Sequence, residues 1–317
     1  MTTTLLATLL MGAVATACTS GEPLDDGRGD MPPRTDGNST PANPAPRAAS
    51  PLAVKIDNVP GARPQTGLDA ADLVYAEQVE GGLSRLMAVY ATRLPDAVGP
   101  VRSARESDLE LLRQFHKPTL AFSGTQKKLL PLFDKAPLQA ALPEKQPTAY
   151  YRSSDKSPPH NLYLRPKRLL ASAPGADALT TGFRYGAAPA GGTAENTRTV
   201  RFPATRFTFD WSGKRKHWLV SMDGAPTATA GGERVAASTV VVQYVKIRES
   251  KYHDYLGSNT PYTETVGSGT AKVLRDGKAF DAAWKRATPA DGTEFTAPDG
   301  TPMNFAEGQV WVVFARA

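Results

Sequence analysis

The sequence predicts an α+β fold, with a mixed α/β N-terminal domain over residues 51–190 and a smaller, mostly β C-terminal domain over residues 195–317. Three observations support this prediction. Strand and helix patterns alternate in the first region, only strand patterns follow in the second, and a stretch rich in Gly, Ala and Pro at 186–197 separates them. A chain of 317 residues with 40% hydrophobic residues can bury the cores of two ordinary domains.

Strand patterns open the N-terminal domain. Residues 52–56 form a short apolar run, and residues 73–79 and 83–92 alternate apolar with polar side chains. The last two flank Glu80-Gly81-Gly82, and this predicts a β-hairpin because glycine adopts the positive φ of a tight turn at little cost. Apolar residues at helical spacing predict a helix from about 105 to 116. Further elements are expected at 120–122 (strand), 125–134 (helix) and 166–171 (helix).

The C-terminal domain has the pattern of a small β structure. Its apolar stretches are short, and Gly or Asp residues separate them, as is typical of strands joined by turns. Strands are expected at 206–209, 217–222, 239–245, 264–267, 271–275 and 309–315.

The first 18 residues have the features of a lipoprotein signal peptide. No charged residue precedes Glu22, and residues 5–17 form an apolar or small-residue run that is too short for a membrane span. Small residues come directly before Cys18, the only cysteine of the chain. We therefore expect cleavage before Cys18 and attachment of lipid, including palmitate, to its thiol. The run lacks the usual preceding Lys or Arg, which an upstream start codon would explain; an ordinary N-terminal anchor helix is the competing interpretation.

Residues 19–50 are rich in Pro, Gly, Ser, Thr, Asn and Asp, a composition that predicts a disordered tether. The whole chain carries a net charge of +6 and this segment contributes −2, so residues 51–317 carry +8. Such a charge favours an acidic partner, such as a polyanionic wall polymer or anionic lipid. The basic residues are dispersed rather than clustered in a binding arm, which argues against nucleic acid as the partner. The predicted location is extracytoplasmic, with the chain anchored to the cell membrane.

Arg102, Ser103 and Arg105 lie where the predicted helix of residues 105–116 begins. Helix N-termini have unpaired N–H groups and favour anions, and guanidinium groups bind phosphate or carboxylate in bidentate fashion. These residues therefore form a candidate anion site. The alternative is that the arginines form structural ion pairs with nearby glutamates.

Glu77 lies before the predicted hairpin turn and Glu80 opens it, and both are candidate general acid/base residues. An odd spacing places them on opposite faces of a regular strand, so a catalytic carboxylate pair would require a bulge. His160 and Asn161 follow a diproline and are suited to hydrogen-bonding a ligand or transferring a proton. A loop histidine beside a core Tyr163 is the structural alternative. No motif predicts a cofactor or a metal site.

Several segments together resemble a known family. In the N-terminal region these are residues 54–58, 62–68, 71–75, 80–85, 99–105 and 159–163, and in the C-terminal region residues 267–269, 277–278 and 308–311 with Tyr244 and Trp284. They are similar to the YerB-type bacterial lipoproteins, a family of unknown function with separate N- and C-terminal domains. The resemblance implies a two-domain envelope lipoprotein and implies no reaction.

The leading hypothesis is a lipid-anchored envelope protein that binds an anionic wall polymer or phosphate-bearing ligand. The predicted binding residues are Arg63, Arg85, Arg102, Ser103, Arg105, His160 and Asn161. The alternative is a hydrolase or transferase acting on a cell-wall glycan or phosphodiester, with Glu77 or Glu80 and His160 as catalytic residues. A third interpretation is a protein–protein adaptor that uses the C-terminal domain.

Overall fold

The computed structural model of the chain describes residues 49–253 and 257–317. The predicted signal peptide, Cys18 and nearly all of the tether over residues 19–50 lie outside the described residues. Within the described part, no helix has the length and apolar character needed to cross a membrane.

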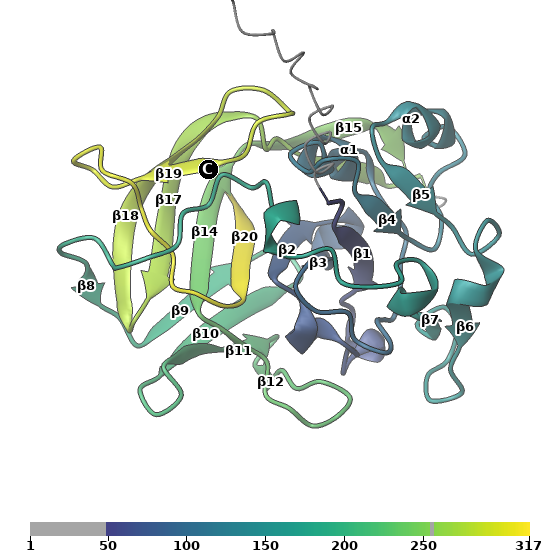
Figure 1. Ribbon diagram of the computed structural model, residues 1–317, viewed down its shortest axis with the longest axis horizontal. Coiled ribbons are helices and arrows are strands. Elements are labelled where there is room, and N and C mark those ends of the chain that lie inside the picture. Colours follow the sequence, from purple (N-terminus) through teal and green to yellow (C-terminus); the bar gives the residue numbers. More distant parts are fainter. Residues whose placement is uncertain (1–48, 254–256) are drawn as a thin grey trace, which may run out of the picture. The chain divides into compact units, whose positions relative to one another are not determined.

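One large mixed sheet organises the described chain (Figure 1). Its strands β2 and β20 run parallel, with Leu73 opposite Val310, so the N- and C-terminal halves of the chain share this sheet. In hydrogen-bonded order its strands are β19 (Glu294–Thr296), β18 (Lys278–Arg286), β17 (Gly267–Arg275), β14 (Thr239–Val245), β20 (Val310–Arg316), β2 (Leu73–Gln78), β3 (Ser84–Tyr90), β1 (Leu52–Asp57), β4 (Thr119–Ala121) and β5 (Gln139–Ala141), with β8 (Thr193–Ala194) beside β18.

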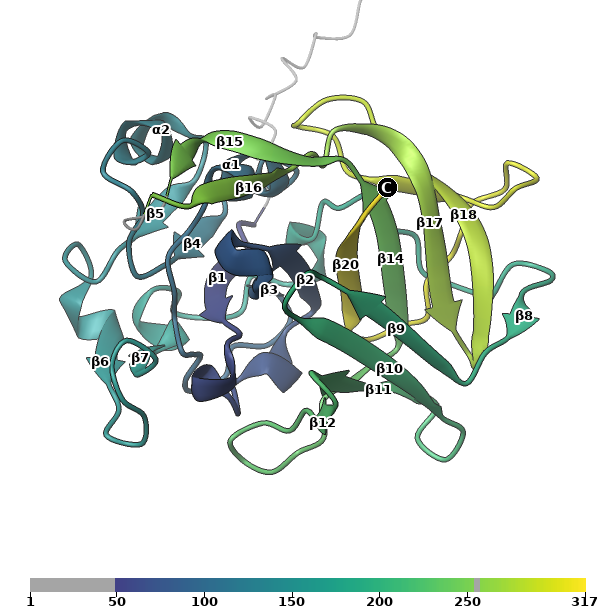
Figure 2. The same ribbon diagram turned by 180° about the vertical axis from the view of Figure 1, so that it is seen from behind.

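Smaller elements surround this sheet, as Figure 2 shows from behind. The second sheet consists of β9 (Thr197–Arg201), β10 (Arg206–Ser212), β11 (His217–Met222), β12 (Ala225–Pro226) and β13 (Ala236–Ala237). Two ribbons are formed by β15 (Ile247–His253) with β16 (Asn259–Thr263), and by β6 (Tyr150–Arg152) with β7 (Leu162–Leu164). The α-helices of the described part are α1 (Glu106–Leu112) and α2 (Leu130–Lys135).

The large sheet is buried on both faces, because successive side chains of a strand point to opposite sides. In β1, Val54 joins one apolar cluster and Ala53 joins the other. The first cluster includes the second sheet, where Phe207 and Phe209 lie with ring centroids 6.2 and 6.0 Å from that of Trp311. The second cluster contains the buried leucines of α1 together with alternate residues of β1, β2 and β3. Each fully buried large apolar side chain stabilises the fold by about 1.5–3 kcal/mol.

Helix α1 begins where the sequence predicts and ends earlier. The Asp108 carboxylate accepts the Arg105 N–H at 2.6 Å, which satisfies a backbone donor of the first turn. Leu111 and Leu112 are buried against the sheet. The α-helix ends at Leu112. A turn follows, in which the Phe115 N–H donates to the Leu112 carbonyl at 3.0 Å.

The described chain is richer in strands than the expected mixed α/β N-terminal domain. The helix predicted over 125–134 begins only at Leu130, with Pro131 in its first turn, where a missing N–H costs no hydrogen bond. The helix predicted over 166–171 is a single 3₁₀ turn, Pro166–Arg168. The prediction of a strand over residues 264–267 is wrong, because residues 264–266 form the connection between β16 and β17. The hairpin of β15 and β16 was not predicted, because its polar side chains mask the alternation.

Candidate functional site

Six of the nine predicted site residues line one cleft of about 420 Å³. The cleft lies where β1 and β2 end and β3 begins, beside the segment that enters α1. Asp57 and Ser258 line the same cleft. The six predicted residues are Glu80, Arg85, Arg102, Ser103, Arg105 and His160.

The alternation of the central strands explains why charged side chains gather here. Lys55 and Asp57 share the face of β1 that Ala53 presents to α1. In the antiparallel register Arg85 of β3 lies opposite both Asp57 and Glu77. The segment of residues 102–105, which enters α1, is fixed over this face because the Arg102 N–H donates to the Lys55 carbonyl at 2.8 Å.

Asp57 connects two of the predicted site residues. Its carboxylate is only 2% exposed, and the Oδ2 atom lies 2.8 Å from His160 Nδ1 and 3.2 Å from Arg102 Nε. His160 is held in a turn in which its N–H donates to the Ser157 carbonyl at 2.9 Å. Both His160 and Arg102 remain about one quarter exposed, so they reach the cleft while Asp57 anchors them from beneath.

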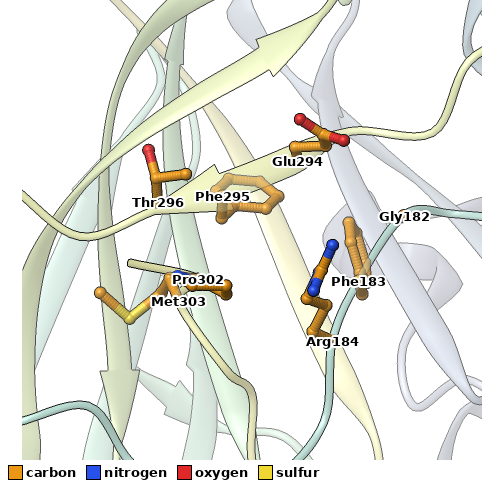
Figure 3. A pocket seen from close by; sticks show the side chains of 8 residues that line it. All are labelled: Gly182, Phe183, Arg184, Glu294, Phe295, Thr296, Pro302 and Met303. Atoms are coloured by element: carbon orange, nitrogen blue, oxygen red, sulfur yellow. The ribbon is translucent and has the colours of Figure 1, made fainter. Parts of the chain in front are cut away.

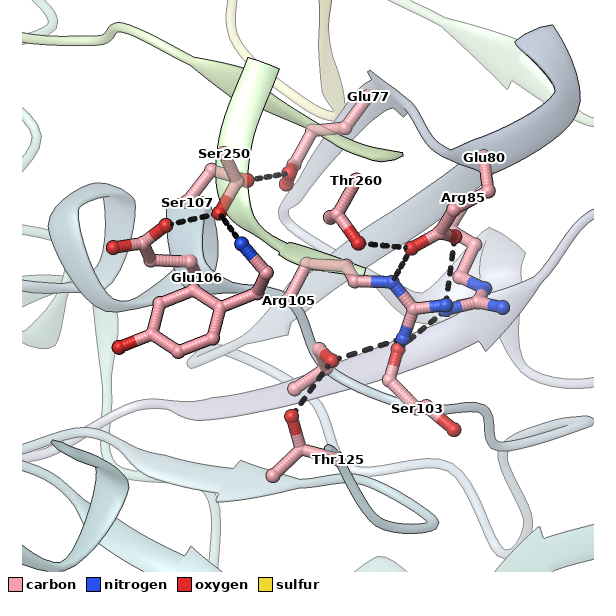
Figure 4. Close-up of polar contacts among 12 residues, drawn as sticks. Glu77, Glu80, Arg85, Ser103, Arg105, Glu106, Ser107, Thr125, Ser250 and Thr260 are labelled. Carbon is pink, nitrogen blue, oxygen red and sulfur yellow. Dashed lines mark hydrogen bonds and ion pairs between the residues drawn. The ribbon is translucent and has the colours of Figure 1, made fainter. Parts of the chain in front are cut away.

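Arg105 is neutralised by Glu80 (Figure 4). Arg105 Nε and one Nη donate to the two carboxylate oxygens of Glu80 at 2.6 and 2.7 Å, and the Thr260 hydroxyl donates to the same carboxylate at 2.6 Å. Burial alone would raise the pKa of Glu80, but the hydrogen bonds and charge of Arg105 outweigh it and hold that pKa below its ordinary value. Glu80 is therefore ionised at neutral pH with both oxygens engaged.

Arg85 has a different environment. Its side chain is enclosed, and one Nη donates to the Ser103 carbonyl at 2.9 Å (Figure 4). Among the described residues, no carboxylate forms an ion pair with it. Burial, together with repulsion from Arg105 and Arg102, lowers the pKa of Arg85 to about 9. The cleft thus contains an enclosed cation that forms no ion pair within the described chain, although the Glu80 and Asp57 carboxylates attract it at longer range.

Glu77 lies outside the cleft, in a buried ionic cluster beneath α1. Lys55 Nζ contacts Glu77 Oε1 at 3.2 Å and Asp108 Oδ1 at 2.6 Å, and all three side chains are at most 2% exposed. The Ser107 hydroxyl donates to Glu77 at 3.3 Å. Burial and the neighbouring Asp108 raise the pKa of Glu77 to about 7, against the charge of Lys55.

Arg63 and Asn161 are also placed outside the cleft lining. Arg63 forms an ion pair with Asp223 at 2.8 Å, and one of its Nη atoms donates to the Asn58 carbonyl at 2.7 Å. The Asn161 side chain accepts from Arg152 at 2.6 Å. Both side chains are therefore engaged in contacts outside the cleft.

Other cavities fit the sequence hypotheses less well. One cavity has a volume of about 70 Å³, below the size of ordinary ligand sites. Its lining combines apolar side chains such as Phe183 and Phe295 with the charged Arg184 and Glu294 (Figure 3). A larger cavity of about 680 Å³ contains Asp69, Asp72 and Glu307 and none of the predicted site residues. Within residues 49–253 and 257–317, no three His, Cys, Asp or Glu side chains gather to hold a metal ion.

Three charged residues of the cleft and its support were not predicted: Asp57, Lys55 and Asp108. A signal for Lys55 and Asp57 was present, because two charged residues on one face of an otherwise apolar strand are unusual unless both are paired. Asp108 gave no comparable signal, since an acidic residue in the first turn of a helix is ordinary.

Comparison with known proteins agrees with the fold and the motifs. The chain is 27% identical over 282 residues to "Putative lipoprotein YerB" of Bacillus subtilis (strain 168), covering 83% of this chain and 80% of the relative. The crystal structure of YerB protein from Bacillus subtilis matches with a TM-score of 0.70 and 21% identity, covering 85% of this chain and 91% of the other, which shows a shared fold. The N- and C-terminal domains of the family described as "Protein of unknown function (DUF3048)" match residues 39–179 and 198–312. The chain therefore belongs to this DUF3048 family.

Proposed function

We propose that the cleft binds an anionic group of a cell-envelope ligand, and that phosphate is the group its chemistry fits best. The observation that carries the proposal is Arg85, an enclosed cation without an ion-pair partner among the described residues. A buried charge without an ion-pair partner is unfavourable, and such residues cluster at ligand-binding and catalytic sites. An anion beside Arg85 would supply the missing charge.

The neighbours of Arg85 make the site suited to an oxyanion. The lining contains three arginines and two carboxylates, so it is positive even when His160 is neutral. The Glu80 carboxylate is already saturated by Arg105 and Thr260, which leaves Arg85 and Arg102 as the donors facing the cleft. Guanidinium groups match the geometry of phosphate oxygens and bind them in bidentate fashion.

We further propose that lipid on Cys18 holds the protein at the outer face of the membrane. A relative named as a lipoprotein and the signal-peptide features of residues 1–18 support this location. The charge of +8 on residues 51–317 would then attract anionic wall polymers or lipid headgroups. Palmitate labelling of cells that express the chain tests the anchor, and unchanged labelling of the Cys18→Ser variant would refute it.

Calorimetric titration of the full chain in detergent with inorganic phosphate tests the anion site. We expect Arg85→Gln to weaken binding by about tenfold to a hundredfold, since a charge-assisted hydrogen bond contributes about 1.5–3 kcal/mol. Arg198→Gln is the matched control, because Arg198 is paired with Glu195 on the second sheet and does not line the cleft. Affinity should also fall as salt rises, although less than for fully exposed charges.

Equal phosphate affinities of the wild type, Arg85→Gln and Arg198→Gln would overturn the proposal. The same conclusion would follow if phosphate failed to bind the wild type at millimolar concentration in low salt.

A further inference from the structure

Asp57 and His160 form a pair that anion binding alone does not require. The buried Asp57 carboxylate lies 2.8 Å from His160 Nδ1, while the imidazole lines the cleft. A carboxylate accepts only the Nδ1–H proton, so this contact selects the tautomer that has a free lone pair on Nε2. Within the described chain, Nε2 has no hydrogen-bond partner. The result is an oriented base at the wall of an anion site.

We propose that the protein hydrolyses phosphate esters in this cleft, with His160 as general base and Asp57 as the residue that positions it. The inference rests on the proposed anion site, because Arg85 and Arg102 must hold the phosphate group beside His160. Phosphate esters are the substrate class, since hydrolysis of a phosphoryl group depends on positioning and on positive charge around its oxygens.

The proposed step is balanced by a single water molecule. His160 Nε2 takes a proton from the water while the water oxygen forms a bond to phosphorus. The bond between phosphorus and the ester oxygen breaks on the opposite side, where the leaving oxygen takes a proton from solvent, and the imidazolium ring releases its proton to solvent. An alcohol and a phosphate with one ester link fewer are released, and His160 returns to its starting state.

The glutamates that the sequence offered as catalytic carboxylates have other partners. Glu80 has both oxygens bonded to Arg105, and Glu77 is buried with Lys55 beneath the cleft floor. Asp57 is the carboxylate that contacts His160. Its role resembles that of an acid that orients a histidine and stabilises the imidazolium ion, without accepting the proton itself.

Turnover of two chromogenic probes by the full chain in detergent tests this inference. The probes are p-nitrophenyl phosphate, a monoester, and bis(p-nitrophenyl) phosphate, a diester. We expect His160→Ala to lower kcat by about a hundredfold to ten-thousandfold, the usual contribution of a general base, and to retain phosphate binding. Added imidazole should restore part of the rate in His160→Ala. His217→Ala is the matched control, because His217 lies on β11 away from the cleft, and it should keep the wild-type rate.

The proposed role of Asp57 in positioning His160 is tested by measurements that distinguish this role from a contribution to folding. We expect Asp57→Asn to lower kcat more than it raises KM, and Asp57→Glu to recover part of the loss. In ¹⁵N spectra of the imidazole, the wild type should show the proton of His160 on Nδ1, and Asp57→Asn should shift the population toward the Nε2–H tautomer. An unchanged spectrum in folded Asp57→Asn would refute the positioning role.

The possible failures are distinguishable. If the wild type binds phosphate but hydrolyses neither probe, or if His160→Ala hydrolyses them as fast as the wild type, the catalytic inference is overturned and the binding proposal stands. If the wild type neither binds phosphate nor hydrolyses a probe, both are overturned.

Discussion

Lys55 is fully buried in the middle of β1, where an unpaired ammonium group would be strongly unfavourable. Glu77 and Asp108 compensate it, and Asp108 also accepts the Arg105 N–H. The backbone carbonyl of Lys55 also accepts a hydrogen bond from the Arg102 N–H. One buried residue thus fixes the backbone of both arginines, which makes the ionic cluster part of the floor that supports the cleft.

Replacing Lys55 tests the importance of this cluster. Lys55→Met leaves two buried carboxylates without their cation, so we expect the free energy of unfolding to fall by about 3–5 kcal/mol in urea denaturation. Lys272→Met is the matched control, because Lys272 is also a strand lysine that pairs with an aspartate, Asp281, but at a partly exposed site. That change should cost at most about 1 kcal/mol. Equal losses in the two variants would contradict the account.

The pH dependence of stability tests the environment of Glu77. Burial and Asp108 raise the pKa of Glu77 to about 7, so the folded state binds its proton more tightly than the unfolded state. The stabilisation by protonated Glu77 is present below about pH 4.5, its ordinary pKa, and is lost as pH rises through about 7. Glu77→Gln cannot lose that proton, so its stability relative to the wild type should increase from pH 4.5 to 7. A constant difference over this range would contradict the raised pKa.

At the scale of elements, α1 joins segments that are distant in sequence. The Glu110 carboxylate accepts from the Tyr262 hydroxyl at 2.8 Å and from the Thr265 N–H at 2.9 Å. Its backbone carbonyl accepts from Arg286 at 2.8 Å. The ribbon of β15 and β16 is attached to the helix in the same way, since Ser250 donates to Glu106. The helix that carries Arg105 is therefore held by the C-terminal half of the chain.

Removing the Glu110 carboxylate should weaken this attachment. Glu110→Ala leaves several donors of the 262–266 segment without their acceptor, and we expect a loss of about 2–3 kcal/mol in the free energy of unfolding. Glu144→Ala, at an exposed loop position, is the control and should change stability by less than about 0.5 kcal/mol. Hydrogen exchange at the Thr265 and Val266 amides should accelerate in Glu110→Ala alone; protection equal to that of the wild type would refute the role of Glu110.

The elements that could be predicted are those with strong local patterns. Strands β11 and β14 have the bounds expected from their apolar runs, and the hairpin of β2 and β3 was found from its alternation and its glycines. Arg85, Arg102 and His160 were assigned to one binding site from the chemistry of their side chains, and no sequence pattern predicted that they would lie together. The Asp57–His160 contact joins residues 103 apart in sequence, and no local pattern specifies such a distance.

At the scale of the whole molecule, the large sheet continues through both predicted domains. Strand β20 lies between β14 and β2, so the last strand of the chain pairs with one from each half. The described residues cluster as one compact unit. The pairing of β20 with β2 and β14 could not be predicted from the sequence, because an apolar run indicates a buried strand but does not specify which strands lie beside it.

This shared sheet predicts cooperative unfolding. All four tryptophans, at 211, 218, 284 and 311, lie in the C-terminal half, so their fluorescence reports mainly that half and, through Trp311 opposite Val74, its junction with β2. Far-ultraviolet circular dichroism reports both halves. We expect the two signals to give one coincident transition in urea. Separate midpoints would show that the halves unfold independently and would contradict the shared sheet.

The central claim is that Arg85 and Arg102 form an anion site together with the Asp57–His160 pair. A crystal structure of the full chain grown with phosphate above its dissociation constant tests this most directly. The account predicts a phosphate ion within hydrogen-bond distance of the Arg85 and Arg102 guanidinium groups, with one oxygen facing His160 Nε2. A cleft without phosphate, in crystals where Arg85 is paired with a carboxylate of its own chain, would contradict it.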